Sequence, residues 1–152
     1  MPDRETKYFG TLSYEPPAVI EFPAGLPGFA HCRQFLPIED AARRPLIFLQ
    51  SLEETELCFL TLRVEAVDPG YLLKMSPEDL ALAGFDALPA PGAEALCLAV
   101  ITAFAGEMPT VNLLAPIVVN RATRRAVQSV RDDSVYGCRH PLGDAAEWPP
   151  CS

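Results

Sequence analysis

The chain has 152 residues, of which 49% are hydrophobic and 21% charged, the composition of a folded globular domain. Twelve Lys and Arg against 20 Asp and Glu give a net charge of −8. This balance argues against binding nucleic acid or anionic lipid, because both need a basic surface. Sixteen prolines disfavour long helices and favour short strands joined by turns. We expect one β domain over residues 1–142 and a flexible C-terminal tail, residues 143–152.

In the first half of the chain, the pattern of apolar residues predicts five strands, at 7–13, 19–22, 34–38, 46–52 and 58–64. The fifth alternates, with Cys58, Leu60, Leu62 and Val64 on one face. Two prolines and two glycines in PAGLPGF at 23–29 predict a tight structural loop, which Phe22 and Phe29 would clamp onto the core. Between the fourth and fifth strands, Glu53, Glu54 and Glu56 are expected in a hairpin turn, either simply solvated or forming a charged contact surface.

In the second half, Ser76 as an N-cap, Pro77 after it and Gly84 as a stop predict one short helix. Residues 95–104 are nearly all apolar and predict a central strand that is covered on both faces. Strands are also expected at 111–120 and 126–130, and Pro116 requires an edge or a bulge in the former. The expected fold is mostly β, a small antiparallel β-barrel-like or sandwich domain with one or two short helices.

The cysteines give no sign of a disulfide framework. Five of them are widely spaced without a Cys-x-x-Cys pair, and the N-terminal sequence MPDRETKY has no apolar segment of the kind that directs export. We therefore expect reduced thiols and a cytoplasmic location. The apolar run 95–119 is broken by Gly106, Pro109, Asn112 and Pro116, which indicates two buried strands rather than a membrane span.

Motifs for chemistry are scarce. The sequence has no glycine-rich phosphate loop, HExxH or GxSxG. By residue type alone, a Cys2His2 zinc site could be formed by two pairs, His31 with Cys32 and Cys138 with His140. Neither pair has the usual spacing of zinc ligands. Cys138 with His31 could form a nucleophile–base pair, although nothing orients the base. We expect no catalytic residue, metal or cofactor, and interpret the chain as a protein-binding module in which the strand broken by Pro116 offers a free edge.

The arginines at 121, 124, 125 and 131 are expected in a solvated turn, because the overall charge is acidic and Asp132 and Asp133 follow directly.

Five short motifs, taken together and in order, resemble the FliW flagellar assembly factor family. They are TKYFG at 6–10, FPAGLPGF at 22–29, LQS at 49–51, NLLAPIVVN at 112–120 and RHPL at 139–142. The resemblance implies a compact β-barrel-like fold and a non-enzymatic role. It implies two protein partners: CsrA, a small mRNA-binding translational repressor whose repression of flagellin synthesis would be relieved, and newly made flagellin. It implies no small-molecule substrate and no direct contact with nucleic acid or membrane.

The resemblance also implies a partner switch, in which accumulating flagellin occupies the protein and frees CsrA. In this family CsrA is bound away from its RNA surface, so mimicry of RNA is not expected. One alternative is a flagellin export chaperone that ignores CsrA, and another is a small β-barrel metal or thiol protein.

A partner surface is predicted on the segment 111–120. Asn112, Pro116 and Asn120 recur every four residues, which in a strand without a bulge at Pro116 places all three on one face together with Leu114 and Val118. If that face points outward, it would contact a partner, and Glu107 and the loop of Glu53, Glu54 and Glu56 would form its rims.

Overall fold

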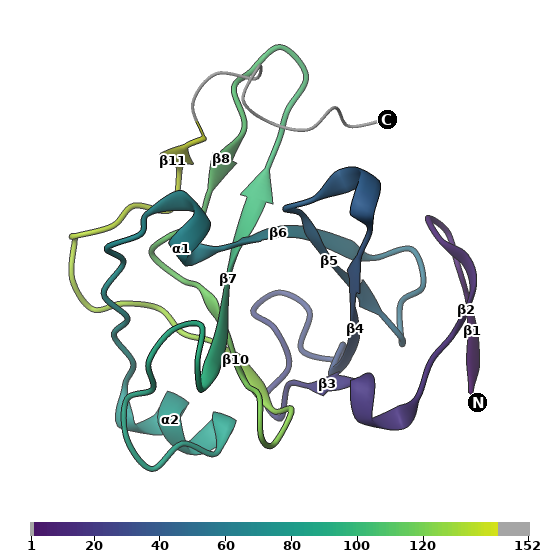
Figure 1. The fold of residues 1–152 in the computed structure, drawn as a ribbon, viewed down its shortest axis with the longest axis horizontal. Coiled ribbons are helices and arrows are strands. Elements are labelled where there is room, and N and C mark those ends of the chain that lie inside the picture. The colour runs from purple at the N-terminus through teal and green to yellow at the C-terminus, as the bar shows by residue number, and fades with distance from the viewer. Residues whose placement is uncertain (1, 143–152) are drawn as a thin grey trace.

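The computed structural model describes residues 2–142 and is built mainly of strands (Figure 1). The strands are β1 (Asp3–Thr6), β2 (Gly10–Ser13), β3 (Ile20–Glu21), β4 (Gln34–Glu39), β5 (Ile47–Ser51), β6 (Cys58–Arg63), β7 (Ala95–Thr102), β8 (Thr110–Val111), β9 (Ile117–Asn120), β10 (Ala126–Gln128) and β11 (His140–Pro141). The helices are α1 (Val64–Val67) and α2 (Pro77–Ala83), with 3-10 turns at Pro16–Ala18 and Ala41–Arg43. The expected mostly β fold with short helices is confirmed. The tail predicted at 143–152 lies outside the described residues.

One antiparallel sheet, in the order β10-β9-β7-β6-β5-β4-β3, forms the body of the molecule. The sheet curls until its two edge strands approach each other. There the N–H of Glu21 donates to the carbonyl of Arg124 at 2.9 Å, and Glu21 and Arg125 form an isolated parallel bridge. The fold is therefore barrel-like without being closed by a full ladder of hydrogen bonds.

Both faces of the central strands are buried, because side chains alternate between two apolar cores. Leu96 and Leu98 of β7 enter the core inside the curl, whereas Cys97 and Ala99 enter a second core outside it. The prediction of a central strand covered on both faces is confirmed. The alternation predicted for β6 is confirmed as well, since Cys58, Leu60 and Leu62 pack on the outer core and Phe59 on the inner one.

Helix α2 begins and ends where the sequence predicts. The hydroxyl of Ser76 accepts a hydrogen bond from the N–H of Asp79 at 3.1 Å, Pro77 opens the helix, and Gly84 ends it with φ of 80°. The one-turn helix α1 directly after β6 has no cap that could have been recognised in the sequence. Among the described residues, no helix is long and apolar enough to cross a membrane.

The strand predicted at 7–13 is confirmed only for residues 10–13, which form β2, because the chain turns at residues 7–9. Residues 7–9 connect β1 to β2, and the two form a separate hairpin. The hydroxyl of Thr6 donates to the carbonyl of Gly10 at 2.9 Å and accepts from the N–H of Phe9 at 3.1 Å, while Gly10 has φ of 63°. A hydroxyl bonding to its own turn and a glycine in left-handed conformation favour a turn over an extended strand.

The single strand predicted at 111–120 is wrong. The Asn112 side-chain oxygen accepts hydrogen bonds from the N–H groups of Leu114 and Ala115 at 3.1 and 3.0 Å, which folds residues 112–116 into a turn between β8 and β9. The free edge expected here is absent among the described strands, because β8 lies between β7 and β11 and β9 lies between β7 and β10. Pro116 lies in this turn, directly before β9, and not at the edge or bulge expected within a strand.

Candidate interaction surface

The acidic turn between β5 and β6 is held in place by hydrogen bonds. The carboxylate of Glu53 accepts from the N–H groups of Arg33 and Gln34 at 3.0 to 3.2 Å. Glu54 Oε1 lies 3.0 Å from His31 Nε2. Glu53, Glu54 and Glu56 are all exposed. The turn therefore presents three carboxylates to solvent from a fixed backbone.

Buried Gln50 supports the same turn from below. Its amide donates to the backbone carbonyls of Ser51, Thr55 and Leu57 at 3.0 to 3.2 Å. The hairpin of β1 and β2 adds a bond from outside, since the N–H of Lys7 donates to the carbonyl of Thr55 at 3.1 Å. Gln50 belongs to the LQS motif at 49–51, and the hydrogen bonds of its amide nitrogen explain why a polar residue occupies a central strand.

Glu107 lies apart from the acidic turn, at the tip of the hairpin that joins β7 and β8. Figure 1 shows this hairpin projecting from the top of the molecule, whereas the turn between β5 and β6 lies at one side near β1 and β2. Phe104 and Met108 on the same hairpin are 62% and 51% exposed. The tip combines one carboxylate with two exposed apolar side chains, a combination that sequence analysis missed because it grouped Glu107 only with acidic residues.

The outward face predicted for Asn112, Pro116 and Asn120 does not exist as one surface. Pro116 and Asn120 are buried, and Asn112 and Leu114 are half-buried. Asn120 donates to the carbonyls of Ala83 and Gly84 and accepts from the N–H groups of Ala122 and Thr123. Residues at even spacing share one face only where the strand is continuous. The turn at 112–116 interrupts the strand, so this rule does not apply. Whether Asn112 and Leu114 contact a partner stays a prediction.

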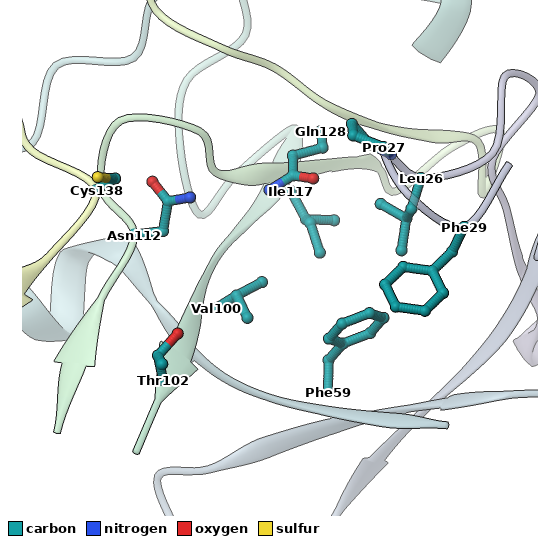
Figure 2. Close-up of a pocket in the computed structure, with 10 residues that line it drawn as sticks. All are labelled: Leu26, Pro27, Phe29, Phe59, Val100, Thr102, Asn112, Ile117, Gln128 and Cys138. Carbon is teal, nitrogen blue, oxygen red and sulfur yellow. The ribbon is translucent and has the colours of Figure 1, made fainter. Parts of the chain in front are cut away.

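A pocket of about 140 Å³ opens where the inner core reaches the surface (Figure 2). In Figure 2 the apolar side chains of Leu26, Phe29, Phe59, Val100 and Ile117 surround it, and Asn112 lies near Cys138 at one side. The pocket is large enough for one apolar side chain of a partner and supplies polar groups at its border.

The loop 23–29 forms one wall of this pocket. Phe22 is fully buried and Phe29 packs against the same core, so the predicted clamping of the loop is confirmed. Gly25 has φ of 71°, and a Cβ atom there would lie 2.4 Å from the carbonyl oxygen of Ala30. The sequence signal that could have located the pocket is therefore this loop, in which two glycines and two prolines fix the position of Leu26 and Phe29.

The thiols differ strongly in their surroundings. Burial raises the pKa of the Cys97 thiol to about 12 and that of Cys58 to about 11. Cys138 is exposed. The described residues place His31 with Cys32 and Glu54, without Cys138 or His140, so the four-residue zinc set considered from the sequence is wrong. His31 is hydrogen-bonded to Glu54. Within residues 2–142, no hydrogen bond joins His31 to Cys138.

One of the four arginines does not lie in a solvated turn. Arg131 is buried, stacks over the ring of Tyr136 at 4.8 Å and donates two hydrogen bonds to Asp133 at 3.0 and 3.1 Å. A further bond goes to the carbonyl of Leu72. The hydrogen bonds from Arg131 lower the pKa of the Asp133 carboxyl. Arg131 thus fixes the C-terminal segment against the loop that precedes α2.

This curled sheet, with exposed carboxylates and an apolar pocket, has the features of a small protein-binding module. The family model described as "FliW protein" matches residues 3–142. The flagellar assembly factors FliW of Desulfitobacterium hafniense and Bacillus subtilis are 35% and 33% identical to this chain, over 94% and 91% of it and 92% and 94% of their own lengths. A crystal structure of the flagellar assembly factor FliW superposes with a TM-score of 0.80 at 25% identity, covering 94% of this chain and 98% of the other. The chain belongs to the FliW family, whose matched relatives are flagellar assembly factors.

Proposed function

We propose that this protein is a non-enzymatic cytoplasmic regulator of flagellin production that binds CsrA and flagellin as alternative partners. Binding CsrA relieves its repression of flagellin mRNA translation, and binding flagellin releases CsrA. The observation that carries the proposal is the match to the FliW family over residues 3–142. If the two partners exclude each other, each lowers the apparent affinity of the other by the same factor.

The charge of the surface supports a partner of this kind. A protein that holds RNA needs basic side chains, and the net charge of −8 on this chain complements them. Complementary charge mainly accelerates encounter and is screened by salt. Glu53, Glu54, Glu56 and Glu107 are exposed and suit this role. The proposal requires no contact with the RNA-binding surface of CsrA itself.

The apolar pocket is the second surface feature that supports binding of a protein partner. Association of two proteins usually depends on a few buried apolar anchors surrounded by polar groups. The pocket beside Phe29 and Phe59 can take one such side chain, and half-buried Asn112 and Leu114 lie on the segment beside it. Buried Pro116 and Asn120 leave the proposed footprint, because a partner cannot reach them without unfolding the turn.

The deciding experiment is a competition between the two partners. Purified protein is mixed with CsrA and separated by size exclusion, and flagellin is then added in increasing amounts. We expect a complex with CsrA that disappears as a complex with flagellin appears. A flagellin complex without any CsrA complex would favour the export chaperone and would overturn the CsrA part of the proposal.

The role of the carboxylates is tested with two exposed glutamates that flank β7 at opposite ends. Strand β7 has eight residues and ends at Thr102. Glu107 lies beyond this end, in the hairpin tip, whereas exposed Glu94 immediately precedes the first residue of the strand. We expect Glu107→Gln and Glu56→Gln to slow association with CsrA several-fold at low salt and much less at high salt. Glu94→Gln is the control with the same charge change. Equal slowing in all three variants would show that only net charge matters.

The role of the pocket is tested through Cys138, which is exposed and lines it. Attaching a maleimide to this thiol fills the pocket opening without changing the core. We expect the modified protein to lose affinity for at least one partner, whereas Cys138→Ser treated in the same way keeps it. Unchanged binding after complete modification of Cys138 would remove the pocket from the proposed footprint.

A further inference from the structure

Three side chains of metal-binding type converge at the acidic turn, and one of them, Glu54, also belongs to the carboxylates assigned above to partner binding. A ligand nitrogen of His31, the Sγ of Cys32 and a carboxylate oxygen of Glu54 all lie within 4.8 Å of one another. His31 and Cys32 belong to the connection between β3 and β4, whereas Glu54 belongs to the turn between β5 and β6. Residues more than 20 positions apart in the chain therefore meet at one point.

The chemistry of the three groups is specific. A thiolate, an imidazole and a carboxylate are each a ligand type of protein-bound zinc, and the thiolate disfavours magnesium and calcium. In tetrahedral zinc with bonds of about 2.0 to 2.3 Å, ligand atoms lie about 3.3 to 3.7 Å apart. Glu54 Oε1 and His31 Nε2 are already 3.0 Å apart. A shift of about 1 Å at the thiol then completes a three-ligand set, with water as the fourth ligand.

The backbone around the cluster is fixed by hydrogen bonds that do not use the three ligand atoms. The carboxylate of Glu53 holds the N–H groups of Arg33 and Gln34, and the N–H of Glu54 donates to Ser51 Oγ at 2.9 Å. The N–H of Cys32 donates to the carbonyl of Phe29 at 2.9 Å. Supporting hydrogen bonds of this kind orient the ligands of metal sites.

The site also lies at the boundary between core and solvent. Cys32 is fully buried, whereas the side chains of His31 and Glu54 are 62% and 47% exposed. Burial raises the pKa of the Cys32 thiol, and the negative charges of Glu54 and Glu53 next to it raise it further. A divalent cation would reverse this effect, since it stabilises the thiolate and releases its proton to solvent.

We propose that His31, Cys32 and Glu54 bind one Zn²⁺ ion, which joins the β3–β4 connection to the acidic β5–β6 turn. Binding forms a bond between zinc and the Cys32 sulfur and releases the thiol proton to solvent, with no change in oxidation state. Because the β3–β4 connection also carries Leu26 and Phe29, the ion would link the wall of the pocket to the carboxylate surface. This inference concerns metal binding itself, and its test requires neither of the proposed partners.

The test is titration of the full chain with Zn²⁺ against a chromophoric chelator, with a phosphine reductant to keep the thiols reduced. We expect one ion per chain. Replacing Zn²⁺ with Co²⁺ should give the near-ultraviolet charge-transfer absorption of a cobalt–thiolate bond. Absence of stoichiometric binding, or binding without thiolate absorption, would overturn the proposal.

Variants identify the ligands. Cys32→Ser should abolish the cobalt–thiolate band, and His31→Ala should weaken zinc binding at least about tenfold. His31 is exposed, so its variant should keep the fold even if the buried Cys32→Ser variant does not. The controls are Cys138→Ser, His140→Ala and Cys151→Ser, the last outside the described residues. The site would be refuted if a control variant lost the cobalt–thiolate band or zinc binding while His31→Ala kept both. The metal would then be bound elsewhere.

Discussion

Replacing Asn120 with Ala tests whether this residue is structural. Its amide joins the end of α2 to the turn between β9 and β10. The side-chain nitrogen donates to the carbonyls of Ala83 at 3.0 Å and Gly84 at 3.3 Å, and the oxygen accepts from the N–H groups of Ala122 at 2.9 Å and Thr123 at 3.3 Å. Because Asn120 is only 5% exposed, water cannot replace all of these bonds.

The expected loss of stability follows from the two shorter hydrogen bonds, those to Ala83 and from Ala122, and from the buried groups that lose their partners. The carbonyl of Ala83 keeps a second donor, the hydroxyl of Thr123, at 3.2 Å, which limits the loss. With a net value of about 1 kcal/mol for each short bond and a penalty of about 1 kcal/mol for unpaired buried groups, we expect about 3 kcal/mol of lost stability. For a domain of this size that corresponds to a fall in Tm of about 6–12 °C.

Thermal unfolding followed by circular dichroism measures this effect, with Glu107→Gln as an exposed control that should leave Tm unchanged. Asn120→Asp should be at least as harmful as Asn120→Ala, since it loses both donors and places a negative charge beside two carbonyls. Well below its Tm, Asn120→Ala should bind CsrA like the unaltered protein. A change in Tm below about 2 °C, combined with lost CsrA binding, would refute the structural assignment and make Asn120 a contact residue.

Three further outcomes are expected. Gly25→Ala should lower stability by more than about 2 kcal/mol, because its Cβ would meet the Ala30 backbone and its φ of 71° is strained for alanine; an unchanged denaturant midpoint would contradict this. Ser76→Ala should cost about 1 kcal/mol through loss of the N-cap of α2, measured by urea unfolding, whereas Ser76→Asp should restore most of it. Among the cysteines of residues 2–142, iodoacetamide at pH 8 should modify exposed Cys138 first and Cys97 last, as read by peptide mass spectrometry. Modification of Cys58, with its pKa of about 11, should accelerate about tenfold per pH unit between pH 8 and 10, and a flat rate would contradict that pKa.

The sequence allowed the fold to be predicted where local patterns agree with the packing. Helix α2 was located because its cap, its proline and its terminal glycine all act within a few residues. The two-sided burial of β7 followed from an apolar run without charge. Failures occurred where a side chain bonds to nearby backbone, as Thr6 and Asn112 do, since such bonds turn a chain that its apolar pattern would extend.

The candidate site was harder to predict, because it depends on which distant segments meet. The carboxylates of the β5–β6 turn were recognised from their position in a hairpin. The pocket was not, since Phe29, Phe59 and Val100 come from three separate segments and each resembles an ordinary core residue. For the same reason the sequence paired His31 with Cys138, whereas the folded chain places it beside Glu54.

The shortness of the outermost strands has a consequence for how other polypeptides can attach. β3 has two residues and β10 has three, and the bridge between Glu21 and Arg125 uses part of the little backbone they leave unpaired. An incoming segment that extended the sheet would gain very few main-chain hydrogen bonds at this seam. Recognition at this seam must therefore rest on side chains, which makes it sensitive to single substitutions and disfavours edge-to-edge stacking there.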